Sequence, residues 1–424
     1  MTLSDDRDTT VTTLANGVRV LTIRQPHLET ASASIFVRTG SAHEAKAENG
    51  ISHFTEHMVF KGTATRDARR INVDAERLGA EVNAHTDKDH TAFHMRGLAG
   101  HAGDFVRMLG DIVGAPTFPA AELESERQVL LHECTEDEDD PLTTAFKLFD
   151  KASFGEHGAA QGVIGPRRHL ERFTRDALAA YVQRQYSGAN VIVGVAGAVD
   201  PDAMARAAEA AFGALPRGTP NVVAPAAWVG GIGTRRIAGS SQAHAVLGFP
   251  VAPATADDPR GTLAAALFGE GMSSPLMDSV RERKGLAYYA ACSADVLEMC
   301  GQFVVEASTG PKQVEELLAE VLALLRRQAE HIDADDLERA RHQIVVRRVR
   351  ARERSQRRLE DAALDLFALG RVKPHAQAIE AVRAVSADAL RDHFAQLLAT
   401  PPAVALAGEL PRAASERVRE ILAR

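Results

Sequence analysis

The chain has 424 residues, of which 45% are apolar and 25% charged, and its formal net charge is -8. This length predicts two domains, each with its own apolar core, and the composition excludes a disordered or fibrous protein. The negative charge argues against nucleic acid as a partner, because nucleic-acid-binding proteins normally present a basic face.

The N-terminal segment lacks the features of an export signal. Residues 1–15 contain Asp5, Asp6 and Asp8, where a secretory signal has basic residues followed by an apolar run. The longest apolar run, residues 191–199, is about half as long as a membrane-spanning helix and predicts a buried strand. We therefore expect a cytoplasmic protein that does not bind a membrane.

Strand-like and helix-like segments are mixed along both halves of the chain. Alternating apolar residues indicate strands, and a spacing of three or four indicates helices. The strand-like segments are 17–23, 31–37, 243–249 and 301–307, and the helical segments are 106–113, 123–131 and 314–325. This mixture predicts an α+β fold in each half.

A proline- and glycine-rich segment divides the chain almost in the middle. It covers residues 215–230 and predicts a linker between a first domain at residues 1–214 and a second at residues 231–424.

Two pairs of similar segments lie at nearly the same offset in the two halves, which predicts two similar domains that arose by internal duplication. The pairs are Phe173–Leu178 with Val385–Leu390, and Ala121–Glu124 with Asp335–Glu338. In the first pair, Thr174 and Ser386 are expected to cap helices.

The segment His53-Phe54-Thr55-Glu56-His57 has the spacing of a metal site. On a helix, histidines four residues apart project from one face and can bind a single zinc ion. Glu56 lies on the same turn, where its carboxylate can accept a proton from a zinc-bound water without binding the ion itself. A solvated helix face is the alternative interpretation, because this short string also occurs in unrelated proteins.

Residues 49–52 before this motif and 58–63 after it resemble the inverted zinc motif of the pitrilysin and insulysin peptidase family. The resemblance is to the branch of short two-domain chains related to processing peptidases. It implies a zinc-dependent endopeptidase with one zinc ion per chain, acting on peptides or unfolded segments.

A catalytic zinc usually has three protein ligands and leaves a fourth position for water, so a further ligand is expected downstream. The segment Glu126–Glu133 resembles the family's second motif, in which two glutamates stand seven residues apart. The resemblance implies that Glu133 is the third ligand and that Glu126 orients the site from behind the ligands. Two solvated residues on an amphipathic helix are the alternative.

Asn83, Ala84 and Thr86 resemble the family's edge strand, whose main chain pairs with an extended peptide substrate. Three further histidines recur nearby, and we interpret them as part of a solvated strand face rather than as metal ligands. They are His85, His90 and His94.

In the second half, the segment Val280–Tyr288 resembles the family's Arg and Tyr motif, with Arg281 and Tyr288 at the matching positions. A guanidinium can hold a peptide carbonyl or terminus, and a phenol can hydrogen-bond the developing oxyanion. The alternative is a charged helix followed by a glycine turn.

The resemblance also implies a clamshell dimer, formed with a second copy or with a paralogous subunit, in which Arg281 and Tyr288 serve the partner's zinc. A rival hypothesis is a non-catalytic or scaffold subunit, because some relatives lost the zinc residues and kept the fold. Every zinc residue that the resemblance matches is present in this chain.

Overall fold

A computed structural model describes residues 8–423, which form two compact units. The first unit comprises residues up to 134 together with 161–223 and 350–376, and the second comprises 135–160, 224–349 and the residues from 377 onward. Asp5 and Asp6, which contributed to the prediction about export, lie outside the described residues.

The first unit contains a six-stranded mixed sheet. Its strands are β1 (Thr9–Thr13), β2 (Arg19–Arg24), β3 (Thr30–Val37), β4 (Glu81–Thr86), β5 (Thr91–Leu98) and β6 (Val191–Gly197). Their order is β1-β2-β6-β3-β5-β4, and only β2 and β6 pair in parallel. Strand β4 therefore lies at one edge.

The second unit contains a five-stranded sheet with a matching order. Its strands are β7 (Gly231–Arg236), β8 (Ala243–Val251), β9 (Ala287–Val296), β10 (Gly301–Thr309) and β11 (Ala403–Gly408). They follow the order β7-β11-β8-β10-β9, and β7 and β11 form the parallel pair. Apart from β1, each strand of the first sheet has a counterpart here. The predicted α+β class with two similar domains is confirmed.

Helices surround both sheets. In chain order they are α1 (Ile51–Val59), α2 (Ala68–Arg77), α3 (Ala102–Gly114), α4 (Ala120–Asp139), α5 (Pro141–Phe154), α6 (Arg167–Leu170), α7 (Arg175–Gln185), α8 (Pro201–Phe212), α9 (Arg260–Gly269), α10 (Pro275–Met277), α11 (Val314–Glu330), α12 (Ala334–Arg352), α13 (Ser355–Leu369), α14 (His375–Ala384), α15 (Ala387–Leu398) and α16 (Ala414–Leu422). The predicted caps are confirmed, since Thr174 Oγ1 accepts from the Ala177 amide and Ser386 Oγ accepts from the Ala389 amide.

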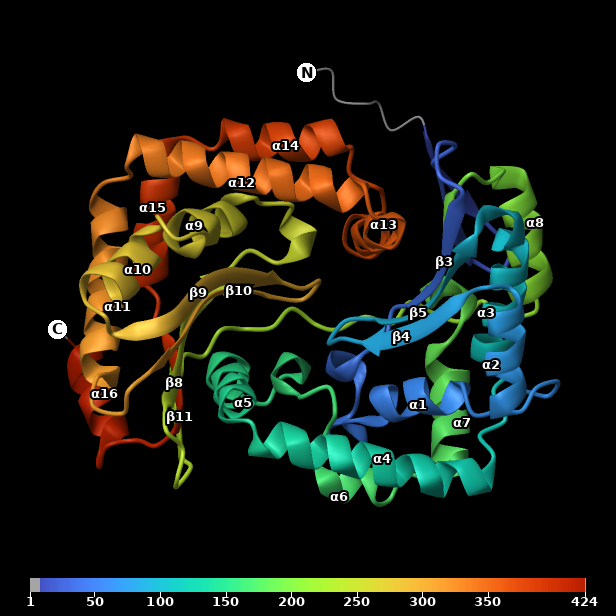
Figure 1. The fold of residues 1–424 in the computed structure, drawn as a ribbon, viewed down its shortest axis with the longest axis horizontal. Helices are drawn as coiled ribbons and strands as arrows, with labels where there is room; N and C mark the ends of the chain where they lie inside the picture. The colour runs from blue at the N-terminus through green and yellow to red at the C-terminus, as the bar shows by residue number, and fades with distance from the viewer. Residues whose placement is uncertain (1–7, 424) are drawn as a thin grey trace. The chain divides into compact units, whose positions relative to one another are not determined.

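The compact units are not consecutive in sequence, because two helices pack on the sheet of the opposite half. Leu359 and Ala363 of α13 pack against Phe36 and Ile192 of the first sheet. In the second unit, Phe149 and its helix α5 pack on β7, β8 and β11. Figure 1 shows orange-red α13 beside the blue strand β3, and teal α5 beside β8 and β11.

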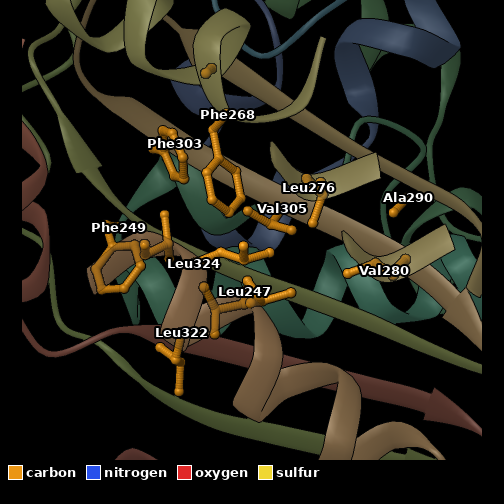
Figure 2. Packing of buried hydrophobic residues seen from close by; sticks show 14 of the residues in the cluster. Leu247, Phe249, Phe268, Leu276, Val280, Ala290, Phe303, Val305, Leu322 and Leu324 are labelled. Atoms are coloured by element: carbon orange, nitrogen blue, oxygen red, sulfur yellow. The ribbon is translucent and has the colours of Figure 1, made fainter. Parts of the chain in front are cut away.

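Helices therefore pack on both faces of each sheet. In β8 and β10, the odd-numbered Leu247, Phe249, Phe303 and Val305 enter a core with helices α9 and α11. Figure 2 shows Phe303 in this core beside Phe268 of α9, and their ring centroids lie 5.9 Å apart. Alternate residues of the same strands face α5, so these strands contact helices on both sides.

Among residues 8–423, no helix combines the length and the apolar composition needed to cross a bilayer.

Shortening one buried side chain of α13 tests whether this helix is an integral layer of the first unit. Leu359 is fully buried, so Leu359→Ala should lower the free energy of unfolding of the first unit by about 2–5 kcal/mol. Urea unfolding of the full chain measures it. The matched control Leu98→Ala removes a leucine that is 56% exposed, and it should change the free energy by at most about 0.5 kcal/mol. Equal effects of the two changes would contradict the packing described here.

Candidate metal centre

Helix α1 carries the predicted zinc motif and buries its opposite face. Ile51, Phe54 and Met58 are at most 1% exposed and pack in the core of the first unit. The imidazoles of His53 and His57 lie together, with ring centroids 4.7 Å apart. The predicted helix and the shared face of its two histidines are therefore confirmed.

A buried carboxylate outside α1 holds the N-terminus of this helix. Its first turn follows Gly50, which has a φ of 99° and supplies no side-chain cap. Instead, Glu44 accepts hydrogen bonds of 2.8 Å from the backbone amides of Gly50 and Ser52 and from Asn49 Nδ2. The Glu44 carboxylate thus satisfies amide groups that the helix leaves unpaired. The sequence analysis missed it, because a capping residue is normally adjacent to the helix.

Helix α4 places two glutamates beside the histidines. Glu133 Oε2 lies 3.9 Å from His53 Nε2 and 3.8 Å from His57 Nε2. Behind His57, its Nδ1 donates a hydrogen bond of 2.8 Å to Glu126 Oε1, and Glu126 Oε2 lies 2.6 Å from Lys61 Nζ. The structure thus brings the four residues together as expected. It adds Lys61, whose partner could not be identified from sequence.

The donor atoms fit a zinc ion. His53, His57 and Glu133 each offer one ligand atom, and these atoms lie within 4.8 Å of one another. The distances from the two histidine Nε2 atoms to Glu133 Oε2 are too long for hydrogen bonds. The three atoms therefore face a shared position instead of each other. Two imidazoles and one carboxylate are a donor set of catalytic zinc, and a fourth position stays open for water.

The two histidines differ in their outer partners. His57 has the carboxylate of Glu126 at Nδ1, which fixes the ring so that Nε2 points toward the shared position. His53 Nδ1 is buried and has no hydrogen-bond partner among the described residues. The orientation of the His57 ring therefore depends on Glu126, and that of the His53 ring depends on packing.

The charges around the histidines favour a cation. Burial lowers the pKa of His53 to about 4, and His57 contributes, so the His53 ring is neutral near pH 7. Burial also disfavours the charged form of His57, but its hydrogen bond to Glu126 and the charge of Glu133 outweigh this and raise its pKa. The carboxylates of Glu126 and Glu133 thus stabilise positive charge beside the shared position.

Glu56 is buried beside these ligands and contacts the edge strand. It is 8% exposed, and burial raises the pKa of its carboxyl above the usual range. The hydroxyl of Thr86, at the end of β4, donates a hydrogen bond of 2.7 Å to Glu56 Oε2. This bond leaves Oε1 available to accept a proton.

The predicted edge strand is an edge strand of the sheet. Asn83, Ala84 and Thr86 lie in β4, which pairs only with β5 in the sheet order. Its other backbone edge can therefore accept a further strand. Pairing with a peptide stays a prediction.

The interpretation of the three nearby histidines as a solvated strand face is wrong for two of them, whereas the side chain of His85 is 37% exposed. His90 and His94 are only 3% and 5% exposed. They are linked through His85, whose Nε2 lies 3.3 Å from His90 Nε2 and whose Nδ1 lies 3.1 Å from His94 Nε2. Contacts that the sequence spacing did not reveal hold the two rings, since His94 Nδ1 lies 2.8 Å from Ser34 Oγ and His90 Nε2 lies 3.9 Å from Glu360 Oε1.

Arg281 and Tyr288 lie in the second unit and form a pair. Arg281 is in a π-helical turn, Asp278–Arg283, and Tyr288 is in β9 at the edge of the second sheet. The guanidinium lies 4.7 Å from the ring centroid of Tyr288, which is 80% exposed. Both side chains are thus available to a ligand, and their proposed role stays a prediction.

Comparison with protein families matches both halves of the chain. Residues 19–167 match the family described as Insulinase (Peptidase family M16), and residues 172–344 match the Peptidase M16 inactive domain. An uncharacterized zinc protease of Rickettsia felis is 29% identical over 89% of this chain and 92% of its own length. The uncharacterized zinc protease YmxG of Bacillus subtilis is 30% identical over 94% of this chain and 98% of its own length.

Solved structures share the fold at lower identity. A protease from Helicobacter pylori superposes with a TM-score of 0.85 at 20% identity, covering 94% of this chain and 98% of its own. A chain of Complex III2 from Candida albicans also superposes with a TM-score of 0.85, at 18% identity. The superposition covers 97% of this chain and 99% of that chain.

Zinc affinity should separate the two glutamates of α4. Glu126→Ala should weaken zinc binding by about 10–100-fold, because it removes the partner of His57 Nδ1 and of Lys61 Nζ but no ligand. Glu133→Ala should weaken it more, because it removes a ligand. Competition with a zinc chelator measures both, and Glu124→Ala on the exposed side of the same helix is the control. Unchanged affinity in Glu133→Ala would rule out this ligand set.

Proposed function

Since this chain belongs to the insulinase family of peptidases, family M16, we propose that it is a zinc-dependent endopeptidase acting on peptides or unfolded segments. The observation that carries the proposal is the convergence of His53, His57 and Glu133, with the buried Glu56 beside them. Zinc held by these three residues would lower the pKa of a water molecule and polarise the peptide carbonyl.

Glu56 acts as the general base. Its raised pKa makes it a stronger proton acceptor than an ordinary glutamate, and its burial keeps bulk water from competing. Thr86 holds one carboxylate oxygen, so the other oxygen takes the proton from the attacking water. The same carboxyl can then deliver the proton to the leaving amine.

Strand β4 binds the substrate as an added strand. An extended peptide would hydrogen-bond the outer main-chain edge at Asn83, Ala84 and Thr86, where it would replace the bond that the Ala84 amide donates to Asn83 Oδ1. Because Thr86 also contacts Glu56, this strand links substrate binding to the base. Only an extended segment can pair in this way, which favours peptides and unfolded regions over folded proteins.

Arg281 and Tyr288 supply donors to the substrate. A guanidinium can bind a peptide carbonyl or terminus, and a phenol can stabilise the oxyanion. We propose that they serve the zinc site of the partner in a clamshell dimer with a second copy or a paralogous subunit. A cytoplasmic location is part of the same proposal.

A non-catalytic or scaffold subunit is the second candidate. The likeness of the fold to a chain of Complex III2 from Candida albicans favours it, because that chain is a component of an assembly. The retained ligand set and base favour the peptidase. Zinc content and cleavage of an unstructured peptide by the purified protein distinguish the two candidates.

Replacement of the base should separate metal binding from catalysis. Glu56→Gln should retain zinc and lose peptidase activity by at least ~10²-fold, because it removes a proton acceptor and leaves all three ligands. Zinc content and hydrolysis of a fluorogenic unstructured peptide are measured on the same sample. Glu48→Gln, which alters an exposed ion pair with Arg184, is the control. Parallel loss of zinc and activity would refute the role of Glu56 as the base.

Mixed dimers test whether the active site is shared. Glu56→Gln and Tyr288→Phe chains, each weakly active alone, should regain activity when co-expressed, because one site of the mixed dimer has both an intact base and an intact phenol. Mass measurement confirms the mixed dimer. If it is no more active than its parents, Tyr288 does not act across the dimer.

A further inference from the structure

A second cluster of ligand atoms lies on the other face of the first sheet. Side chains alternate along β4, and Val82 and Ala84 pack in the core that contains α1. His85 therefore projects from the opposite face, where α13 packs. There it meets His90, which precedes β5, and Glu360 of α13.

The three ligand atoms have the spacing of a coordination shell. His85 Nε2 lies 3.3 Å from His90 Nε2 and 3.5 Å from Glu360 Oε1. His90 Nε2 lies 3.9 Å from the same carboxylate oxygen. Ligands bound about 2.0–2.2 Å from a tetrahedral zinc ion are separated by about 3.3–3.6 Å. The two distances from His85 Nε2 match this spacing, and the distance from His90 Nε2 to Glu360 Oε1 is slightly longer.

Hydrogen bonds from the outer ring nitrogens orient both imidazoles. His90 Nδ1 lies 2.8 Å from Asp89 Oδ1, and a carboxylate accepts the proton of this nitrogen. His85 Nδ1 lies 3.1 Å from His94 Nε2, and His94 Nδ1 lies 2.8 Å from Ser34 Oγ. With protons on the three Nδ1 atoms, every bond in this chain has a donor and an acceptor.

This arrangement leaves lone pairs on His85 Nε2 and His90 Nε2, which face each other and the Glu360 carboxylate. Without a metal ion, a proton on either Nε2 can form hydrogen bonds to the other ring and to the carboxylate, so a bound ion would take the place of that proton. Arg357 lies 3.4 Å from the other oxygen, Glu360 Oε2, so Oε1 is available to the cluster. His90 is almost fully buried and the side chain of His85 is 37% exposed, which gives an ion a route of entry.

We propose that His85, His90 and Glu360 form a second binding site, for a divalent transition-metal ion such as zinc. The donor set of two imidazoles and one carboxylate suits zinc better than calcium or magnesium, which prefer oxygen ligands. The site is separate from the centre on α1, and its occupancy does not depend on the proposed peptidase activity.

An ion here joins α13 to the β4–β5 hairpin. The next residue after His85 is Thr86, whose hydroxyl holds Glu56 on the other face of the sheet. Binding therefore fixes the strand that positions the base. This consequence for catalysis rests on the proposed function, whereas the metal site itself does not.

Zinc stoichiometry of the full chain tests the site. After chelator treatment and zinc titration, wild type should bind two zinc ions, and the double variant His53→Ala/His57→Ala should bind one. Adding Glu360→Gln or His90→Ala to that double variant should abolish binding, whereas adding His101→Ala, an exposed histidine, should not. A double variant that folds, as judged by circular dichroism, and binds no zinc overturns the proposal.

A cobalt spectrum and hydrogen exchange give independent readouts. Cobalt bound to the double variant should show the intense visible bands of tetrahedral coordination, which are lost with Glu360→Gln. Zinc should slow amide exchange across residues 81–98 in the double variant and leave exchange unchanged when Glu360→Gln is added. Zinc binding without slowed exchange overturns the link to β4. An absence of peptidase activity, with zinc still bound in the double variant, contradicts the proposed function and not the second metal site.

Discussion

The candidate site depends on how helix α1 is held in place. This helix has nine residues, which is too short for stability in isolation, and it begins at a glycine without a side-chain cap. Two interactions compensate: Glu44 binds the free amides of its first turn, and Phe54 and Met58 anchor its inner face. Because the histidines and Glu56 share these nine residues, their mutual geometry follows from this anchoring.

Features with a local cause could be predicted from the sequence. The spacing of His53 and His57 fixes a shared helix face, and Thr174 and Ser386 cap helices through amides three residues away. Repeated segments predicted two similar domains, and the matching sheet orders agree. In each case the interacting groups lie close together in sequence, or the same pattern occurs twice.

Features that depend on long-range packing could not be predicted. Lys61 and Thr86 have no local signal for their contacts with Glu126 and Glu56, because those contacts join separate elements. Glu360 lies more than two hundred residues from His85, so sequence spacing could not connect them. The approach of His90 to Glu360 likewise depends on α13, which is encoded in the other half of the chain.

The placement of α13 has a consequence for synthesis of the protein. The ribosome completes the last strand of the first sheet at Gly197, but the helix that covers the face containing Phe36 and Ile192 is finished only at Leu369. During the intervening elongation, at about 5–20 residues per second, that apolar face has no cover from its own unit. The nascent chain therefore passes through a period of several seconds or more in which association with a chaperone competes with aggregation.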